Sequence, residues 1–280
     1  MHDKKLLGLH INSTAPFFAR GGKEYYIEDF DLLTMTLSAL SWRKLGNEIL
    51  MVTDKVGLDY YKSIGITDLW DNVLDIIPCD LDGINPKMFW AAGKVLALRE
   101  FDCPVCLIDN DFILWEMPEL NSEIVAAHYE SVNNDIYPPI DYFNMKDYIF
   151  PKFNWNVKAL NTAFLYINNE DFKQFYTSQA LYFMKSAVHS DDFLCYMVFA
   201  EQRLLSMCAE YTKIKASTLL DENSLWNNNR YTHIWGAKQA MRDNPQERQT
   251  FCNKCISRLE RDFPEYKYIF DRVVNFIKDR

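Results

Sequence analysis

Apolar residues along this chain follow two spacings that alternate from the beginning. Short, mostly apolar runs such as Leu6–Ile11 and Glu48–Thr53 predict strands that are buried on both faces. Between these runs, apolar residues at every third or fourth position over Glu28–Leu45 predict an amphipathic helix that ends at Gly46. Because strands and helices alternate in this way, the first half of the chain is typical of an α/β fold with a mainly parallel central sheet.

The pattern continues, less regularly, to the end of the chain. Further strands are expected at Val73–Ile77, Pro104–Trp115, Glu123–His128, Asn161–Ile167 and Thr212–Ser217. Further helices are expected at Leu58–Ser63, Pro86–Glu100, Asp171–Ala187 and Asp191–Tyr211. The segment Ser131–Asn156, rich in Pro, Asn, Asp and aromatic residues, predicts a long surface loop. We expect one α/β domain at residues 1–244, with an amphipathic helical C-terminal appendage at residues 245–280 packed on it.

Charge and hydropathy indicate which ligands and which cellular location to expect for this protein. A net charge of −9 at pH 7 leaves no basic stripe for a nucleic-acid backbone, so local cations must hold any phosphorylated ligand. No stretch approaches the about 20 apolar residues that cross a bilayer. The apolar run near the start of the chain is too short for a signal segment. We therefore expect a cytoplasmic protein without a transmembrane segment, and peripheral membrane contact stays open.

Seven scattered cysteines, an odd number, do not indicate a disulfide framework. Two pairs, Cys103/Cys106 and Cys252/Cys255, have the C-x-x-C spacing of zinc ligands. The first pair lies on or beside a strand, where positions three apart face opposite sides, and the second lies on the apolar stripe of a helix. We interpret these thiols as core residues, with structural zinc as the alternative.

Two aspartates interrupt the most apolar of the expected strands. In an extended segment, residues two apart project to the same side, so Asp109 and Asp111 are expected to point at one spot. Two carboxylates at one spot repel each other unless a cation lies between them, and a hard divalent ion prefers oxygen ligands. Further along, His233, Gly236 and Lys238 supply a third possible ligand, a glycine and a cation. These residues together predict a metal ion that holds a diphosphate.

Polar clusters follow several of the expected strands, at the edge where open parallel sheets bind nucleotides. We take Asn12, Thr14, Thr53, Asp54 and Asn110 as candidate nucleotide-binding residues for this reason. Ordinary turn chemistry is the alternative explanation for each cluster. Neither G-x-G-x-x-G nor G-x-x-x-x-G-K-[ST] occurs, which argues against a Rossmann dehydrogenase and a P-loop enzyme.

The order of these features resembles the metal-dependent GT-A glycosyltransferases of the glycogenin and galactosyltransferase type, including uncharacterised bacterial relatives. The resemblance rests on the D-x-D of Asp109 and Asp111, on a strand ending in Asn168-Asn169, and on the late H-x-x-G-x-K from His233 to Lys238. The lysine stands one position earlier than in the commonest form of that motif. The resemblance implies that Asp109, Asp111 and His233 bind Mn²⁺ or Mg²⁺, and that a UDP-sugar is the donor.

The same resemblance implies roles for residues elsewhere. Lys94, on the helix before the D-x-D, and Asn161, on a later strand, are expected to contact the nucleotide sugar. The backbone of Gly236 and the Lys238 ammonium are expected to share the charge of the diphosphate. Three carboxylates are candidates for steadying a cationic sugar or activating a hydroxyl, as in glycoside hydrolysis: Asp191, Asp192 and Glu201.

The expected function is transfer of a hexose from a nucleotide sugar to a saccharide or glycolipid acceptor, as in the synthesis of a surface polysaccharide. A sugar-phosphate nucleotidyltransferase and a non-catalytic protein that binds nucleotides or carbohydrates remain as alternatives. Trp155, Trp226 and Trp235 are expected either to stack on sugar rings or to pack in the core. The sequence leaves the donor sugar, the acceptor, the retaining or inverting outcome and the oligomeric state open.

Overall fold

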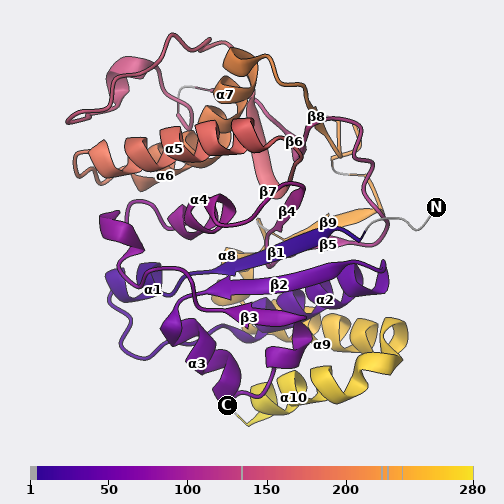
Figure 1. Cartoon of the computed structure of the whole chain (residues 1–280). Helices are drawn as coiled ribbons and strands as arrows, with labels where there is room; N and C mark the ends of the chain where they lie inside the picture. Colours follow the sequence, from indigo (N-terminus) through magenta and orange to yellow (C-terminus); the bar gives the residue numbers. More distant parts are fainter. Residues whose placement is uncertain (1–4, 134, 222, 226, 235, 280) are drawn as a thin grey trace.

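The computed structural model describes residues 5–133, 135–221, 223–225, 227–234 and 236–279. Across these residues the chain forms a seven-stranded sheet in the order β3-β2-β1-β4-β7-β6-β8 (Figure 1). Only β7 is antiparallel to its neighbours β4 and β6, and the other strand pairs in this sheet are parallel. The strands are β1 Leu7–Asn12, β2 Glu48–Thr53, β3 Asn72–Leu74, β4 Val105–Ile108, β6 Ile124–Glu130, β7 Ala159–Ile167 and β8 Ala216–Thr218. The predicted α/β class with a mainly parallel central sheet is confirmed.

Helices cover both faces of this sheet (Figure 1). One face packs against α4 Ala92–Arg99, α5 Glu170–Ser186, α6 Phe193–Val198 and α7 Leu204–Thr212. The other packs against α2 Asp29–Lys44, α9 Pro245–Asp262 and α10 Lys267–Lys278. The shorter helices are α1 Ala15–Ala19, α3 Lys55–Ser63 and α8 Lys238–Asp243, with 3₁₀ turns at Thr67–Leu69, Leu81–Gly83, Ile140–Tyr142 and Pro264–Tyr266. Because both faces are covered, every residue of β4 and β7 is buried.

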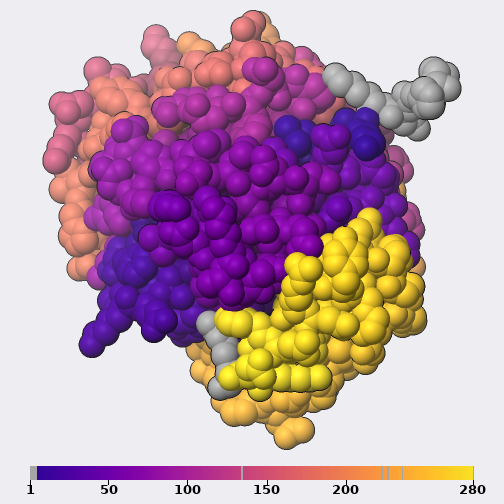
Figure 2. All heavy atoms as spheres, turned by 60° about the horizontal axis from the view of Figure 1, so that its bottom comes forward, coloured from indigo at the N-terminus to yellow at the C-terminus, as the bar shows by residue number. Residues whose placement is uncertain are grey.

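The C-terminal helices complete the core on the α2 side. Leu259 of α9 and Val273 of α10 are fully buried in the same apolar cluster as Phe30 and Leu33 of α2. Figure 2 shows these last helices, in yellow, lying directly on the purple surface of the N-terminal half. The C-terminal helices thus pack on the N-terminal half as expected. The domain boundary at residue 244 stays a prediction.

Two predicted helices differ from those in the structure. The helix expected from Pro86 begins only at Ala92, because the Asn85 side chain accepts hydrogen bonds from the Lys87 and Met88 amides and holds a turn there. The helix expected over Asp191–Tyr211 begins at Phe193 and contains a π-helical segment, Phe199–Arg203, between α6 and α7. The helix continues as α7 through Thr212. The strand expected at Thr212–Ser217 is therefore β8, which begins only at Ala216.

Over its described residues, the segment 131–156 is irregular and mostly exposed, as predicted, but it also contributes side chains to the core. Four of its aromatic side chains are buried, Tyr137, Phe143, Tyr148 and Phe153. Phe143 lies 4.5 Å from Phe199, ring centre to ring centre, at the π-helical segment. The aromatic residues anchor the segment in the core while its polar residues face outward, a division that a count of polar residues does not reveal.

Candidate functional site

The two aspartates lie at a tight turn that joins β4 to β5 (Phe112–Leu114). The Phe112 amide donates to the Asp109 carbonyl over 2.9 Å, and the Asp109 amide donates to the Ala163 carbonyl of β7 over 2.8 Å. The strand predicted over Pro104–Trp115 is therefore broken at this turn, because the chain leaves the main sheet after Ile108. The convergence of the two carboxylates, inferred from an extended strand, comes instead from the turn.

A short strand that the sequence analysis missed brings in the histidine. β9 (Tyr231–His233) pairs with β5 in a separate two-stranded antiparallel sheet, and His233 stands opposite Phe112. The His233 and Phe112 rings meet edge to face at 5.6 Å between centres. This pairing places the imidazole next to the turn, with His233 Nε2 at 3.8 Å from Asp111 Oδ1.

Asp109, Asp111 and His233 form a group whose potential ligand atoms all lie within 4.8 Å of one another. Burial lowers the pKa of His233 to about 4, so its imidazole is neutral at pH 7 and has a lone pair for a metal ion. Burial would raise the pKa of Asp111, but Lys238 and His233 outweigh it and the pKa is lowered. Burial raises the pKa of Asp109 to about 6 even though Lys94 opposes the change. Two carboxylates and a neutral imidazole are a donor set that fits Mn²⁺.

The turn itself offers a further oxygen. The Asn110 Nδ2 donates to the Ile11 carbonyl over 3.2 Å, which fixes the amide against the end of β1. Among the described residues, its Oδ1 has no hydrogen-bond partner although it is buried. A buried acceptor without a donor is costly, so this atom is poised for a ligand or a water molecule.

Two lysines neutralise the aspartates. Lys94 Nζ lies 2.5 Å from Asp109 Oδ1 and 2.6 Å from Glu201 Oε1, which also accepts a hydrogen bond from the Thr162 hydroxyl. Lys238 Nζ lies 2.9 Å from Asp111 Oδ2. Burial would lower the pKa of each ammonium, but the neighbouring carboxylates outweigh it and raise the pKa, so both lysines are charged.

These groups line a cleft of about 970 Å³ at the carboxyl ends of β1 and β4. The predicted site residues along it come from both halves of the chain: Asn12, Lys94, Asp109, Asn110, Asp111, Asn161, Glu201, His233 and Lys238. Among the described residues, the cluster of Asp109, Asp111 and His233 is the only set of His, Cys, Asp and Glu with metal-ligand spacing. Of the C-x-x-C cysteines, Cys106, Cys252 and Cys255 are buried, as the core interpretation predicts, whereas Cys103 is only partly buried.

Other predicted site residues have structural partners and do not line the cleft. Asp54 is fully buried, caps α3 through the Gly57 amide and accepts hydrogen bonds from the Thr14 amide and hydroxyl. The Thr53 hydroxyl donates to the Asn12 carbonyl over 2.6 Å. Their hydrogen bonds connect the carboxyl ends of β1 and β2 and so hold in place the backbone that borders the cleft.

The two adjacent aspartates just before α6 are also absent from the lining of the cleft. Asp191 is exposed, and Asp192 caps α6 at the Cys195 amide and accepts a hydrogen bond from the Tyr142 hydroxyl. Gly236 is exposed as well and does not line the cleft. Trp226 and Trp235 fall outside the described residues, whereas Trp155 stacks on Phe199, as the core alternative predicts.

The cleft also contains Glu130 and Tyr137, which the sequence does not single out, and Gln202, which together with Glu201 matches an acceptor-side position of the resemblance. Glu130 accepts a hydrogen bond from Asn161 over 2.9 Å, and Gln202 accepts one from the Tyr137 hydroxyl over 2.6 Å. Glu130 ends a strand and Tyr137 lies in an irregular segment, so neither position carries a motif. The helical stretch that includes the π-helical segment lines the cleft from one face, with Leu194, Val198, Glu201 and Gln202.

Comparison with known proteins places the chain in a family without assigning it an activity. The sequence profile described as "Family of unknown function (DUF6734)" matches residues 17–275. The chain belongs to this family. A search of curated proteins finds no significant match.

Three similar solved structures are glycosyltransferases by name. GlyE of Streptococcus pneumoniae TIGR4 is 10% identical with a TM-score of 0.39, and the match covers 78% of this chain but only 46% of that one. An active-site mutant of LgtC is 11% identical with a TM-score of 0.41, covering 70% of each chain. The galactosyltransferase LgtC with donor and acceptor sugar analogues is 11% identical with a TM-score of 0.40, covering 71% of each.

Proposed function

We propose that this protein is a metal-dependent glycosyltransferase that moves a hexose from a UDP-sugar to a saccharide or glycolipid acceptor. The observation that carries the proposal is the convergence of Asp109, Asp111 and His233 within 4.8 Å at the carboxyl ends of parallel strands. A nucleotide in an open α/β sheet binds at this edge. The ligand atoms come from segments far apart in the chain, so turn chemistry alone does not explain their meeting.

Mn²⁺ or Mg²⁺ bound by these three residues would neutralise the diphosphate as the bond between sugar and phosphate breaks. Lys238 faces the cleft beside Asp111 and is the residue that we assign to the phosphate oxygens. Lys94 lies between Asp109 and Glu201, where it holds both carboxylates in place on the floor of the cleft. Asn110 Oδ1, on the turn, is available to a hydroxyl or a water molecule.

The remaining cleft residues suit a saccharide. Amide and carboxylate groups of Glu130, Asn161 and Gln202 offer the donors and acceptors that sugar hydroxyls require. Trp90 and Tyr137 add aromatic surface on which a sugar ring can pack. We assign this part of the cleft to the transferred hexose and the acceptor.

Glu201 is our candidate for the catalytic carboxylate. Its side chain is buried and bonded to both Lys94 and Thr162, so its position is fixed. A fixed carboxylate at the cleft can stabilise the positive charge that develops on the sugar. Asp191 and Asp192, predicted together with it, are a weaker choice because neither lines the cleft.

The test is isothermal titration of UDP into the protein with Mn²⁺, with Mg²⁺ and with chelator, followed by an assay for hydrolysis of UDP-sugars. We expect binding that requires the metal ion and weakens at least tenfold in Asp111→Asn, roughly the effect of disturbing a metal ligand. Asp59→Asn is the control, because Asp59 pairs with Lys55 at the surface. Metal-dependent binding without hydrolysis or transfer would favour the non-catalytic alternative. Preference for a nucleoside triphosphate would favour a nucleotidyltransferase, and binding that ignores metal would contradict the proposed site.

Three parts of the sequence prediction remain proposals. Location in the cytoplasm is one, and the acceptor class is another. Peripheral contact with a membrane is the third. Among the described residues, no helix combines the length and the apolar character needed to span a bilayer.

A further inference from the structure

Lys238 has two carboxylate partners, and only one of them belongs to the candidate metal centre. Its Nζ lies 2.9 Å from Asp111 Oδ2 and 2.9 Å from Asp31 Oδ1. Asp31 stands in the first turn of α2, far from the D-x-D in the sequence, and does not line the cleft. It therefore touches the site only through the lysine.

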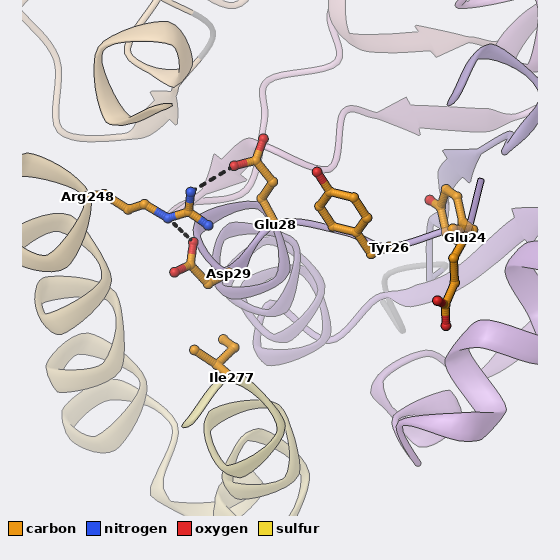
Figure 3. A pocket seen from close by; sticks show the side chains of 7 residues that line it. Glu24, Tyr26, Glu28, Asp29, Arg248 and Ile277 are labelled. Atoms are coloured by element: carbon orange, nitrogen blue, oxygen red, sulfur yellow. Dashed lines mark hydrogen bonds and ion pairs between the residues drawn. The ribbon is translucent and has the colours of Figure 1, made fainter. Parts of the chain in front are cut away.

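Asp31 belongs to a fixed array of charges where α2 meets α8 and α9. Its second oxygen lies 4.0 Å from Arg242 Nη2, and Arg242 Nε lies 2.6 Å from Glu28 Oε1. Arg248 of α9 in turn reaches between Glu28 and Asp29, at 3.0 and 2.7 Å (Figure 3). Lys238 and Arg242 are four residues apart on α8, so they face α2 from the same side. The array holds the Asp31 carboxylate at a defined place beside the cleft.

The two carboxylate partners of Lys238 differ in one respect: Asp111 would also be needed by a metal ion, and Asp31 would not. A metal ion at Asp111 would compete with the ammonium for the same carboxylate, since both cations need its negative charge. An ammonium has three donors, so a lysine held by Asp31 can release Asp111 and still keep one charged partner. Without Asp31, a partly buried Lys238 would depend on Asp111 alone.

We propose that Asp31 is a positioning residue, which holds Lys238 at the wall of the cleft so that Asp111 is available to a divalent cation. This inference rests on the proposed function, because it presumes that the cluster of Asp109, Asp111 and His233 binds metal. It adds a residue that touches neither metal nor substrate. In this proposal, α2 and α8 carry the two side chains, Asp31 and Lys238, that support the candidate metal centre.

The test measures Mn²⁺ affinity of the nucleotide-free protein at fixed pH, by following the paramagnetic resonance signal of free Mn²⁺. In Asp31→Asn, Lys238 keeps Asp111 as its charged partner and competes more strongly with a metal ion for that carboxylate. We therefore expect the affinity for Mn²⁺ to fall on the order of threefold to tenfold. Asp31→Glu keeps the carboxylate and should recover most of the affinity. Asp29→Asn is the matched control, because Asp29 lies in the same helical turn but pairs with Arg248 instead of Lys238.

Lys238→Met separates positioning from a general effect of charge. If Asp31 acts through Lys238, adding Asp31→Asn to Lys238→Met changes Mn²⁺ affinity less than about twofold. An equal loss with and without Lys238, or an unchanged affinity in Asp31→Asn, overturns the role of Asp31 and leaves the metal site intact. Failure of the unaltered protein to bind Mn²⁺ overturns the metal site, and this inference with it.

Discussion

At the scale of single residues, Lys94 is the side chain that lets two carboxylates lie together beneath the cleft. It contacts Asp109 and Glu201 at 2.5 and 2.6 Å, and all three side chains are partly or wholly buried. Removing one partner of such a group leaves uncompensated charge, which is far more destabilising than the intact group is stabilising. The group is therefore a sensitive point for stability and for the proposed metal binding.

Lys94→Met is expected to lower the free energy of unfolding by about 3 kcal/mol, because Asp109 and Glu201 would then repel each other in a partly buried place. Urea unfolding measures the change. Saturating Mn²⁺ should restore part of the loss by binding at Asp109. Lys185→Met, which removes an exposed pair with Asp82, is the control and should cost less than about 1 kcal/mol. Equal losses in the two variants would contradict the expectation.

The sequence predicts the central residues of the site better than their surroundings. Asp109, Asp111 and His233 form motifs, and they do meet in space. Asp31 carries no such signal, because an aspartate in the first turn of a helix is explained by the helix dipole alone. Only the tertiary contact with Lys238 distinguishes it from Asp29.

At the scale of elements, the π-helical segment Phe199–Arg203 joins the cleft to the segment 131–156. The Arg203 guanidinium donates to the carbonyls of Tyr137, Pro138 and Trp155 over 2.6, 3.3 and 2.5 Å. One side chain thus ties both ends of an irregular segment to a helix. The same π-helical segment carries Glu201 and Gln202, which line the cleft together with the start of the segment 131–156.

Arg203→Lys is expected to lower the free energy of unfolding by about 2 kcal/mol, because an ammonium cannot reproduce the spread of the guanidinium donors. The segment 131–156 should then be cut faster by a protease under native conditions. Limited proteolysis with mass spectrometry of the fragments measures this. Arg261→Lys, which alters an exposed pair with Asp262, should leave the cleavage rate unchanged. Unaltered cleavage in Arg203→Lys would show that the aromatic anchors suffice.

The bounds of some long apolar elements are predicted closely, whereas short and irregular elements are missed. β2 has the predicted bounds, and the α2 helix differs by one residue at each end. The three-residue strand β9 is too short to show a period, and it forms only because β5 lies beside it. The π-helical segment has no distinct sequence pattern, since its apolar residues also fit an α-helix.

At the scale of the whole molecule, α9 and α10 supply apolar surface that the rest of the fold requires. Their core side chains are Cys252, Cys255, Leu259, Phe263, Ile269, Phe270, Val273 and Val274. At about 1.5–3 kcal/mol for each large apolar side chain, their burial is comparable to the 5–15 kcal/mol by which a typical domain is stable. These two helices therefore contribute to the same apolar core as α2, while the boundary at residue 244 stays a prediction.

A chain that ends at Asn244 is therefore expected not to fold. It would expose the buried face of α2 and remove Arg248 from Glu28 and Asp29. Circular dichroism and size exclusion, with the full chain as the reference, would detect the expected loss of structure or aggregation. A monomeric truncated protein with a cooperative melting transition would instead support an independent domain at residues 1–244.

The division of the candidate metal ligands between an early turn and a late strand also sets the order in which they are made during biosynthesis. Synthesis proceeds from the N-terminus, so Asp109 and Asp111 leave the ribosome long before His233 and Lys238. A nascent chain that has formed β1 to β4 holds both aspartates without the imidazole. The α2 surface also stays uncovered until α9 and α10 are made. All three candidate ligands are present only after about five-sixths of the given sequence has been made, so the proposed metal site can form only late in synthesis.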